Sequence, residues 1–322
     1  MTEARAGSRS PIGVIDIFAG PGGLGEGFSS FQTGIDAGEH PFELAVSAEM
    51  EKSAHSTLQL RAFYRLAIRQ LGIVPQEYWE YTHNLAAGHT LTPKEYFSST
   101  GLASLWREAE AEALNLTLGN EDHNRALLDR ITNVRDSYDE IVLVGGPPCQ
   151  AYSLVGRARQ KNVKGFKTKG DPRHFLYRQY LEILGRFRPA VFIMENVKGI
   201  LTSTVGNQEM FSAIMRDLAD PNAALGHRVA GSAGERYVLL PIHVPEGCER
   251  THELVERDPA AFIIRSEMHG IPQARHRVII MGVREDVMRP AVARIPGLQI
   301  CSSPETIQHA LAGLPALRSG LS

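Results

Sequence analysis

The sequence lacks the features that mark several large classes of protein. Its 322 residues contain no run of about 18 apolar residues, so we expect no membrane-spanning helix. Residues 1–10 are polar and carry no apolar segment of the kind found in secretion signals. The three cysteines, Cys149, Cys248 and Cys301, are too few and too scattered to predict a disulfide framework or a zinc site. We therefore expect a reducing, cytoplasmic compartment.

Strong charge and metal-binding patterns are also missing. The net charge is only −2, so any binding of nucleic acid has to depend on a local basic patch. The twelve histidines form no HExxH pattern and no Cys/His cluster, and we predict no metal site. With 43% hydrophobic and 22% charged residues, the composition is that of an ordinary globular chain of one large domain, or of one domain and part of another.

The most informative stretch is an apolar run, residues 141–144, that leads into Gly145-Gly146-Pro147-Pro148-Cys149-Gln150. The run predicts a buried strand of a parallel sheet. The two glycines allow a tight exit from that strand, and the two prolines stiffen the backbone that follows. Cys149 is thus expected on a rigid loop at the carboxyl end of a strand, where open α/β sheets bind their ligands. This setting favours a nucleophilic thiol over a cysteine of the core.

Residues 12–18 predict a first strand, followed by a glycine-rich turn and a helix. Such a turn brings bare backbone N–H groups close to a ligand. Gly20, Gly22 and Gly25 satisfy the dinucleotide pattern G-x-G-x-x-G, which is weak evidence when it stands alone. Asp16, inside the strand, is expected to suit a cationic ligand group better than a pyrophosphate. The absence of lysine from the turn argues against a nucleoside-triphosphate loop.

A second predicted strand covers residues 42–48 and ends in Glu49. An acid at this position is placed to accept hydrogen bonds from ribose hydroxyls, although it is also typical of a solvated helix start. Met50 is expected to lie against an adenine face. The first fifty residues therefore indicate an adenosine-containing ligand without a phosphate site.

The stretch from about residue 73 to 138 is longer than a simple connection between a strand and a helix. It follows a predicted helix over residues 51–72, and we interpret it as an insertion with a third strand near residues 113–118. Asn120 and Asp129 are two candidates for closing the adenine pocket, and the sequence does not choose between them.

A basic segment follows the predicted nucleophile. Its cations are Arg157, Arg159, Lys161, Lys164, Lys167, Lys169 and Arg173, against the single acid Asp171. A solvated charged loop is the simple interpretation. The position directly after Cys149 favours a lid that contacts phosphates.

Two further patterns bring polar side chains to strand ends. A strand over residues 190–194 ends in Glu195 and Asn196, next to the predicted strand of the nucleophile. A buried glutamate there is expected to hold a proton at neutral pH and donate it to a base, with helix capping as the structural alternative. Arg275 and Arg277, spaced by one residue at the start of a strand, point to one face and suit carbonyl or phosphate oxygens.

Taken together, these motifs resemble the cytosine-C5 DNA methyltransferase family, in the order in which the family has them. They are Asp16-x-Phe18-Ala19-Gly20-x-Gly22-Gly23, Gly145-Gly146-Pro147-Pro148-Cys149-Gln150-x-x-Ser153, Glu195-Asn196-Val197 and Gly270-x-Pro272-Gln273-x-Arg275-x-Arg277. The resemblance implies a Rossmann-like α/β methyltransferase fold with a mostly parallel central sheet and helices on both faces. It also implies S-adenosylmethionine as methyl donor and a flipped cytosine of double-stranded DNA as substrate.

The resemblance assigns roles to single residues. The Cys149 thiolate adds to cytosine C6, Glu195 binds the N3 and amino edge, and Arg277, with Arg275 near it, contacts the base carbonyl or a phosphate. Asn196 braces the loop of the two prolines. The residues expected at the cofactor are Asp16, Phe18, Ala19, Gly20, Gly22, Gly23, Leu24, Glu49, Met50 and Pro147. Those expected at the DNA are Gln150, Ser153, Arg157, Arg159 and Asn196.

The chain departs from the family at its end, where we find no target-recognition region and no final Gly-Asn-Ser-Val-type motif. We expect a flexible segment over residues 1–11, a catalytic domain over residues 12–285 and the start of a recognition region from residue 286. A fragment of a longer protein, or a second chain that supplies the rest, would explain the pattern.

Three other functions compete with DNA methylation in a restriction-modification or defence system. The first is the related tRNA methyltransferase, although its Cys-Phe-Thr tripeptide is absent. The second is a catalytically idle homologue that binds nucleic acid. The third is a nicotinamide oxidoreductase, which depends on G-x-G-x-x-G alone.

Overall fold

The computed structural model describes residues 11–148 except 33–39, 87, 89 and 90, residues 174–243 except 203, 206–207 and 227–235, and residues 259–314 except 289–296, 302 and 304. Five of the predicted site residues lie outside this part of the chain, together with the rest of the predicted basic segment. They are Cys149, Gln150, Ser153, Arg157 and Arg159.

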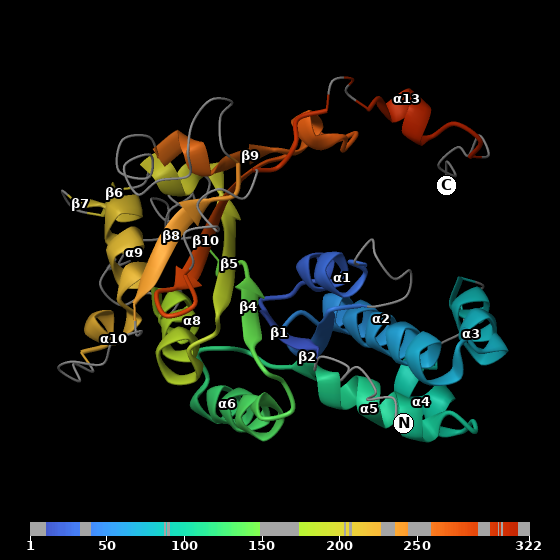
Figure 1. Cartoon of the computed structure of the whole chain (residues 1–322). Coiled ribbons are helices and arrows are strands. Elements are labelled where there is room, and N and C mark those ends of the chain that lie inside the picture. The colour runs from blue at the N-terminus through green and yellow to red at the C-terminus, as the bar shows by residue number, and fades with distance from the viewer. Residues whose placement is uncertain are drawn as a thin grey trace, which may run out of the picture.

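Eight strands of the described residues form one central sheet, in the order β3-β2-β1-β4-β5-β10-β8, with β9 also paired to β10. Five neighbouring strands run parallel: β3 (Ala113–Asn115), β2 (Phe42–Glu49), β1 (Ile12–Ile17), β4 (Ile141–Gly145) and β5 (Val191–Val197). β10 (His276–Arg284) runs antiparallel to β5, and β8 (Tyr237–Pro241) and β9 (Ile263–Arg265) run antiparallel to β10. Figure 1 shows the sheet at the centre of the molecule.

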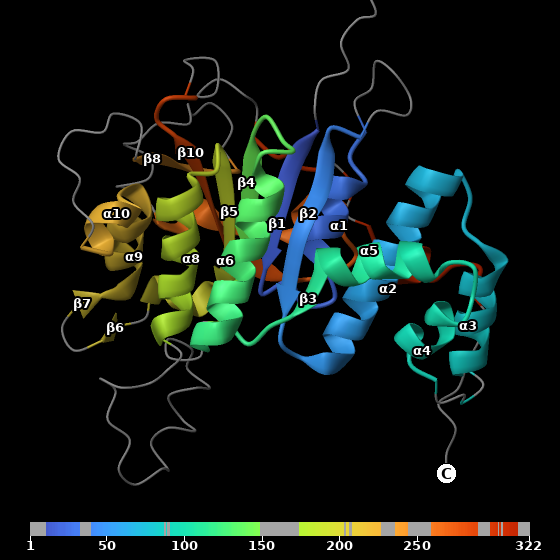
Figure 2. The same cartoon turned by 90° about the horizontal axis from the view of Figure 1, so that it is seen from below.

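Helices cover both faces of the sheet, as the resemblance implied. On one face, the helix α1 (Gly23–Ser29) packs through Leu24 and Phe28 against Val14 and Val144. On the other face lie α6 (Glu121–Arg135), α8 (His174–Phe187) and α9 (Met210–Ala219), which contribute Ile131, Tyr180 and Phe211 to the largest apolar cluster. Figure 2 shows α6 and α8 side by side across the sheet. This arrangement confirms the predicted α/β fold with a mostly parallel sheet.

A lobe of helices flanks the β2–β3 edge of the sheet (Figure 1). It consists of α2 (Lys52–Leu71), α3 (Gln76–Ala86), α4 (Pro93–Ser98) and α5 (Ala103–Glu112). Its core is aromatic: the ring centroids of Phe63 and Phe97 are 4.3 Å apart, and those of Phe97 and Trp106 are 5.2 Å apart. Only α3, α4 and α5 of the predicted insertion are therefore additions to the fold. β3 is a strand of the central sheet, and α6 packs against that sheet.

The remaining elements are short. They are η2 (Lys198–Thr202), β6 (Thr204–Val205), β7 (Gln208–Glu209), α10 (Pro221–Ala224), η3 (Pro259–Phe262), η4 (Ser266–His269) and α13 (Ile307–Ala310). In the part of the chain that the structure describes, no helix is both long and apolar enough to cross a membrane.

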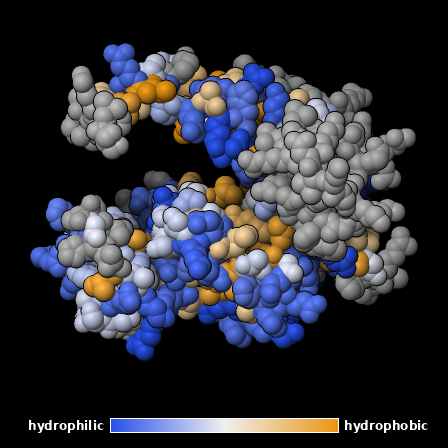
Figure 3. Space-filling view, turned by 180° about the vertical axis from the view of Figure 1, so that it is seen from behind, coloured by the Kyte–Doolittle hydropathy of each residue, from blue (hydrophilic) through white to orange (hydrophobic). Residues whose placement is uncertain are grey.

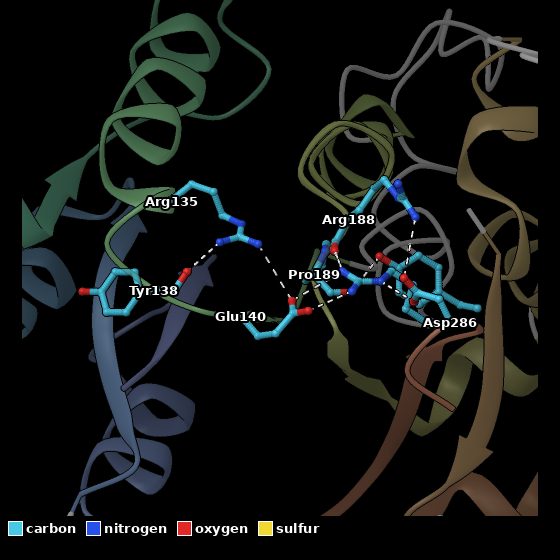
Figure 4. Close-up of polar contacts among 8 residues, drawn as sticks. Arg135, Tyr138, Glu140, Arg188, Pro189 and Asp286 are labelled. Carbon is cyan, nitrogen blue, oxygen red and sulfur yellow. Dashed lines mark hydrogen bonds and ion pairs between the residues drawn. The ribbon is translucent and has the colours of Figure 1, made fainter. Parts of the chain in front are cut away.

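A buried polar network ties together the segments at the start of β4 and β5 and the end of β10. Arg284, 8% exposed, donates to Glu140 at 2.9 Å and to Asp286 at 2.6 Å, and also to the carbonyl of Arg188. Figure 4 shows Glu140 facing Arg135, which in turn donates to the carbonyl of Tyr138 at 2.8 Å. This network lies at the amino ends of β4 and β5, whereas the predicted site residues follow their carboxyl ends.

Candidate active site

The topology gathers the predicted motifs at one edge of the sheet. The parallel strands β1, β2, β4 and β5 all end there, and β10 begins there because it runs antiparallel to β5. The glycine turn, Glu49, the double-proline loop, Glu195 and Arg277 therefore come from five strands but share one edge. Figure 3 shows that the molecule is hollowed between the segment that carries α13 and the helices below it, and that apolar side chains line part of this hollow.

The glycine turn after β1 has a backbone that needs its glycines. Gly20 and Gly22 have φ angles of 57° and 91°, and Phe18 also has a positive φ of 57°. A Cβ atom on Gly22 would lie only 2.8 Å from Leu58 Cδ1. By contrast, a Cβ atom on Gly20 or Gly23 would meet no atom of the described residues within 4 Å. The backbone of the turn therefore faces open space, as a ligand-binding turn requires.

Glu49 joins this turn to the end of β2. Its Oε2 atom accepts a hydrogen bond from the Gly20 amide at 2.8 Å, and its Oε1 atom accepts one from the Glu51 amide at 2.7 Å. Each carboxylate oxygen has a further lone pair, so both can still accept from hydroxyl groups. Met50 follows with 57% of its surface exposed. The end of β2 thus presents a carboxylate with free lone pairs beside an exposed apolar side chain.

Asn115 is a residue of this corner that the sequence did not single out. It ends β3, and its side-chain amide donates to the carbonyls of Glu49 at 2.9 Å and Met50 at 3.2 Å. Neither earlier candidate joins this contact: Asn120 is the N-cap of α6, and Asp129 is exposed on that helix. The position at the end of the predicted third strand was the available signal for Asn115.

Asp16 differs from the expectation that its carboxylate faces a ligand. The side chain is completely buried, and its Oδ2 atom accepts a hydrogen bond from the Gly25 amide of α1 at 3.1 Å. Burial is the main cause that raises the pKa of Asp16 to about 7, with Glu49 also raising it and the Gly25 hydrogen bond and Arg65 lowering it. Through this hydrogen bond Asp16 fixes the first turn of α1, which directly follows the glycine turn.

Glu195 and Arg277 form the polar centre of the other half of the edge. The Nε atom of Arg277 lies 2.7 Å from Oε1 of Glu195, across the β5–β10 pair. Their side chains are 27% and 25% exposed, so the expectation that Glu195 is buried is wrong. A Cβ atom on Gly146 would lie 3.0 Å from Glu195 Oε2, which places the glycine–proline loop directly against this ion pair.

Asn196 braces the double-proline loop, as the resemblance implied. Its side-chain amide donates to the Pro147 carbonyl at 3.0 Å, and its Oδ1 atom accepts from the Val197 amide at 2.9 Å. Asn196 is 6% exposed, which differs from the DNA contact expected for it, and Pro147 is likewise buried rather than open to a cofactor. Arg275 is exposed and lies outside the ion pair of Arg277 with Glu195.

Comparisons with known proteins relate this chain to DNA methyltransferases. The chain is 27% identical over 314 residues to the Type II methyltransferase M.Bpa9945I of Bacillus paralicheniformis, which covers 95% of this chain and 61% of that protein. It is 30% identical over 186 residues to the Type II methyltransferase M.BbvI of Brevibacillus brevis, covering 58% of this chain and 38% of that protein. It is 28% identical over 175 residues to the DNA (cytosine-5-)-methyltransferase M.ApeKI of Aeropyrum pernix, covering 54% and 32%.

A solved structure of a prophage-encoded E. coli protein, described as a DNA modification methyltransferase, superposes with a TM-score of 0.45 at 18% identity, covering 95% of this chain and 56% of that one. The chain thus spans about three fifths of the length of M.Bpa9945I.

The fold indicates the general class of the protein, and the comparisons indicate a family within it. A parallel sheet with a glycine turn after its first strand and an acid at the end of its second has the Rossmann-like architecture of S-adenosylmethionine-dependent methyltransferases. Residues 102–226 match the family of C-5 cytosine-specific DNA methylases. The chain is therefore similar to cytosine-C5 DNA methyltransferases, in the residues that the family model matches and along the relatives named above.

Proposed function

We propose that this chain carries the catalytic part of a DNA (cytosine-5-)-methyltransferase of the restriction-modification type, with S-adenosylmethionine as methyl donor and double-stranded DNA as substrate. The observation that carries the proposal is the ion pair of Glu195 and Arg277 beside Gly146, at the sheet edge that also holds Gly20 and Glu49. A base-binding pair and a nucleoside-binding turn thus share one edge.

The residues of the first half of the edge fit the donor. Open space above Gly20 and Gly23 leaves room for it, Glu49 offers free lone pairs to ribose hydroxyls, and exposed Met50 offers an apolar surface to the adenine ring. Asn115, whose amide is already engaged, keeps its side-chain oxygen as an acceptor for the adenine amino group. When bound, the donor supplies an electrophilic methyl group.

The residues of the second half would act on the cytosine. The Cys149 thiolate would form a bond to C6, the C5–C6 electron pair would shift to C5, and C5 would take the methyl group while the electron pair of the broken sulfur–methyl bond stays with the leaving S-adenosylhomocysteine. The Glu195 carboxylate would accept a hydrogen bond from the cytosine amino group, and the guanidinium of Arg277, whose Nε atom lies 2.7 Å from Glu195 Oε1, would fix the direction of that carboxylate. Loss of the C5 proton then restores the double bond and breaks the bond between carbon and sulfur.

Transfer of a labelled methyl group tests the proposal. The chain is incubated with labelled S-adenosylmethionine and either duplex DNA or tRNA, and we expect label in the DNA alone. Calorimetric titration should show binding of S-adenosylhomocysteine and no binding of NAD. Label found only in tRNA, or binding of NAD alone, would contradict the proposal.

A further inference from the structure

Asp16 is a buried carboxyl group to which the chemistry above gives no part. It lies in β1 directly below the glycine turn, with no exposed surface. Its Oδ2 atom is held by the Gly25 amide, but its Oδ1 atom has no hydrogen-bond partner among the described residues. A buried carboxylate with an unpaired oxygen costs free energy unless it is protonated or paired with a cation.

Among the described residues, no Lys or Arg side chain forms an ion pair with Asp16. Arg65 of α2 is near enough to act on it, but the Arg65 guanidinium is bound to Glu26 of α1 and Glu112 of α5. The Glu49 carboxylate of β2 opposes a charge on Asp16, and the Tyr180 hydroxyl of α8, whose own pKa is raised by burial above all and also by Asp16, stays neutral. The free protein therefore favours a neutral Asp16.

The nearest polar side chain across the strand pair is uncharged. Ser47 of β2 lies opposite Asp16 in the β1–β2 register, and it too is completely buried, with an Oγ atom that has no partner among the described residues. A hydroxyl can accept a hydrogen bond from a neutral carboxyl or donate one to a carboxylate, so Ser47 is compatible with either state of Asp16.

We propose that Asp16 is a positioning residue that becomes charged when the methyl donor binds, because the donor brings the positive charge that this corner lacks. In the free protein the carboxyl holds its proton. Binding of the donor at the glycine turn would bring its positive charge to this corner and release that proton to solvent, while Oδ2 keeps the Gly25 N–H group in place. This inference rests on the proposed function and adds a coupling between donor binding and one proton.

Calorimetry at several pH values tests the coupling with the chain and its Asp16→Asn variant. For the unmodified chain, the affinity for S-adenosylmethionine should fall about five- to tenfold between pH 8 and pH 6, beyond any change in the variant. S-adenosylhomocysteine lacks the sulfonium and should show a much smaller change. Near pH 7, buffers of different ionisation enthalpy should report proton release on donor binding. Asp217→Asn, which removes a carboxyl with a raised pKa in α9, is the matched control and should keep the full pH dependence.

The outcomes separate the inference from the proposed function. Equal pH dependence in the chain and in Asp16→Asn, or equal dependence for both ligands, contradicts the inference and leaves the function standing. Absence of binding of either ligand at every pH contradicts both. If Asp16→Asn does not fold, infrared difference spectra of the unmodified chain decide: loss of a protonated carboxyl band on donor binding supports the coupling, and an unchanged band overturns it.

Discussion

At the scale of single residues, the Glu195–Arg277 pair shows how a motif acquires its geometry only in the fold. The two residues are far apart in the sequence, and the β5–β10 register brings Nε and Oε1 to 2.7 Å. The pair is about a quarter exposed, so its ionic energy adds little to stability. Its value lies in fixing the direction of the carboxylate that would face the base.

Replacement of Arg277 tests this view. We expect Arg277→Ala to lower kcat/KM for methyl transfer by about 100-fold or more, because Glu195 loses the group that orients it. The free energy of unfolding should change by less than about 1 kcal/mol. Arg277→Lys keeps the charge but not the planar fork and should recover only part of the rate. Full activity in Arg277→Ala would contradict the role given to the pair.

Asp16 predicts an unusual pH dependence of stability. Its pKa is about 7 in the folded chain, whereas the ordinary pKa of an exposed aspartate is 3.8, so the folded state binds more protons between these limits. The free energy of unfolding therefore falls as the pH rises through this range, by up to about 4 kcal/mol from this residue. Urea unfolding at pH 5 and pH 8 should show the fall in the unmodified chain relative to Asp16→Asn. Parallel pH profiles of the two proteins would refute the assignment.

Asn196 carries a third prediction at this scale. Asn196→Ala removes the donor to the Pro147 carbonyl and leaves a buried acceptor unpaired, which should cost about 1–3 kcal/mol. The loop that leads to Cys149 would then be held less firmly, so kcat should fall more than KM rises. Urea unfolding and steady-state kinetics measure the two effects. Unchanged kcat with lowered stability would limit Asn196 to a structural role.

At the scale of elements, the glycine turn between β1 and α1 is the part whose shape the sequence dictates most tightly. The position of Gly22 requires glycine for two reasons: its φ of 91° is strained for other residues, and a Cβ atom there would clash with Leu58. Gly22→Ala should cost about 1–3 kcal/mol and weaken binding of S-adenosylhomocysteine. Gly27→Ala is the matched control, because a Cβ atom there meets nothing within 4 Å; it should be neutral or slightly stabilising. Equal effects of the two changes, seen by calorimetry and thermal unfolding, would contradict the account of the turn.

The elements that the sequence predicted well are those with sharp ends. Apolar runs that stop at glycines or at an acid predicted β1, β2, β4 and β5, because parallel strands buried on both faces leave such runs. β3 has only three residues, and its pairing with β2 decides what Asn115 touches. Such contacts depend on register, which local sequence does not contain.

At the scale of the whole molecule, the two ends of the sheet have different tasks. One edge gathers the functional motifs, and the other holds the network of Arg284, Glu140 and Asp286 shown in part in Figure 4. The rule that ligands bind at the carboxyl ends of parallel strands was enough to predict the first edge from the order of the motifs. The burial of Asp16 and Asn196 was not predictable, because it depends on how α1 and the double-proline loop pack.

The network at the opposite edge should affect stability alone. Arg284→Ala removes the donor that Glu140, Asp286 and the Arg188 carbonyl share and should cost about 1–3 kcal/mol, because Arg284 is almost buried whereas the two carboxylates are partly exposed. Methyl transfer measured well below the unfolding temperature should keep its rate, since this edge lies away from the site. Arg125→Ala, at an exposed pair on α6, is the control and should change stability by less than about 0.5 kcal/mol. A loss of rate in folded Arg284→Ala would contradict the division of the two edges.

The central claim is that the Cys149 thiol and the Glu195 carboxylate act on one cytosine. The most direct measurement is covalent trapping with duplex DNA that carries 5-fluorocytosine, in the presence of S-adenosylmethionine, followed by mass spectrometry of the peptide. We predict an adduct on Cys149 that is absent in Cys149→Ala and forms about 100-fold more slowly in Glu195→Gln. Methyl transfer to DNA without an adduct, or an adduct on another residue, would contradict the account.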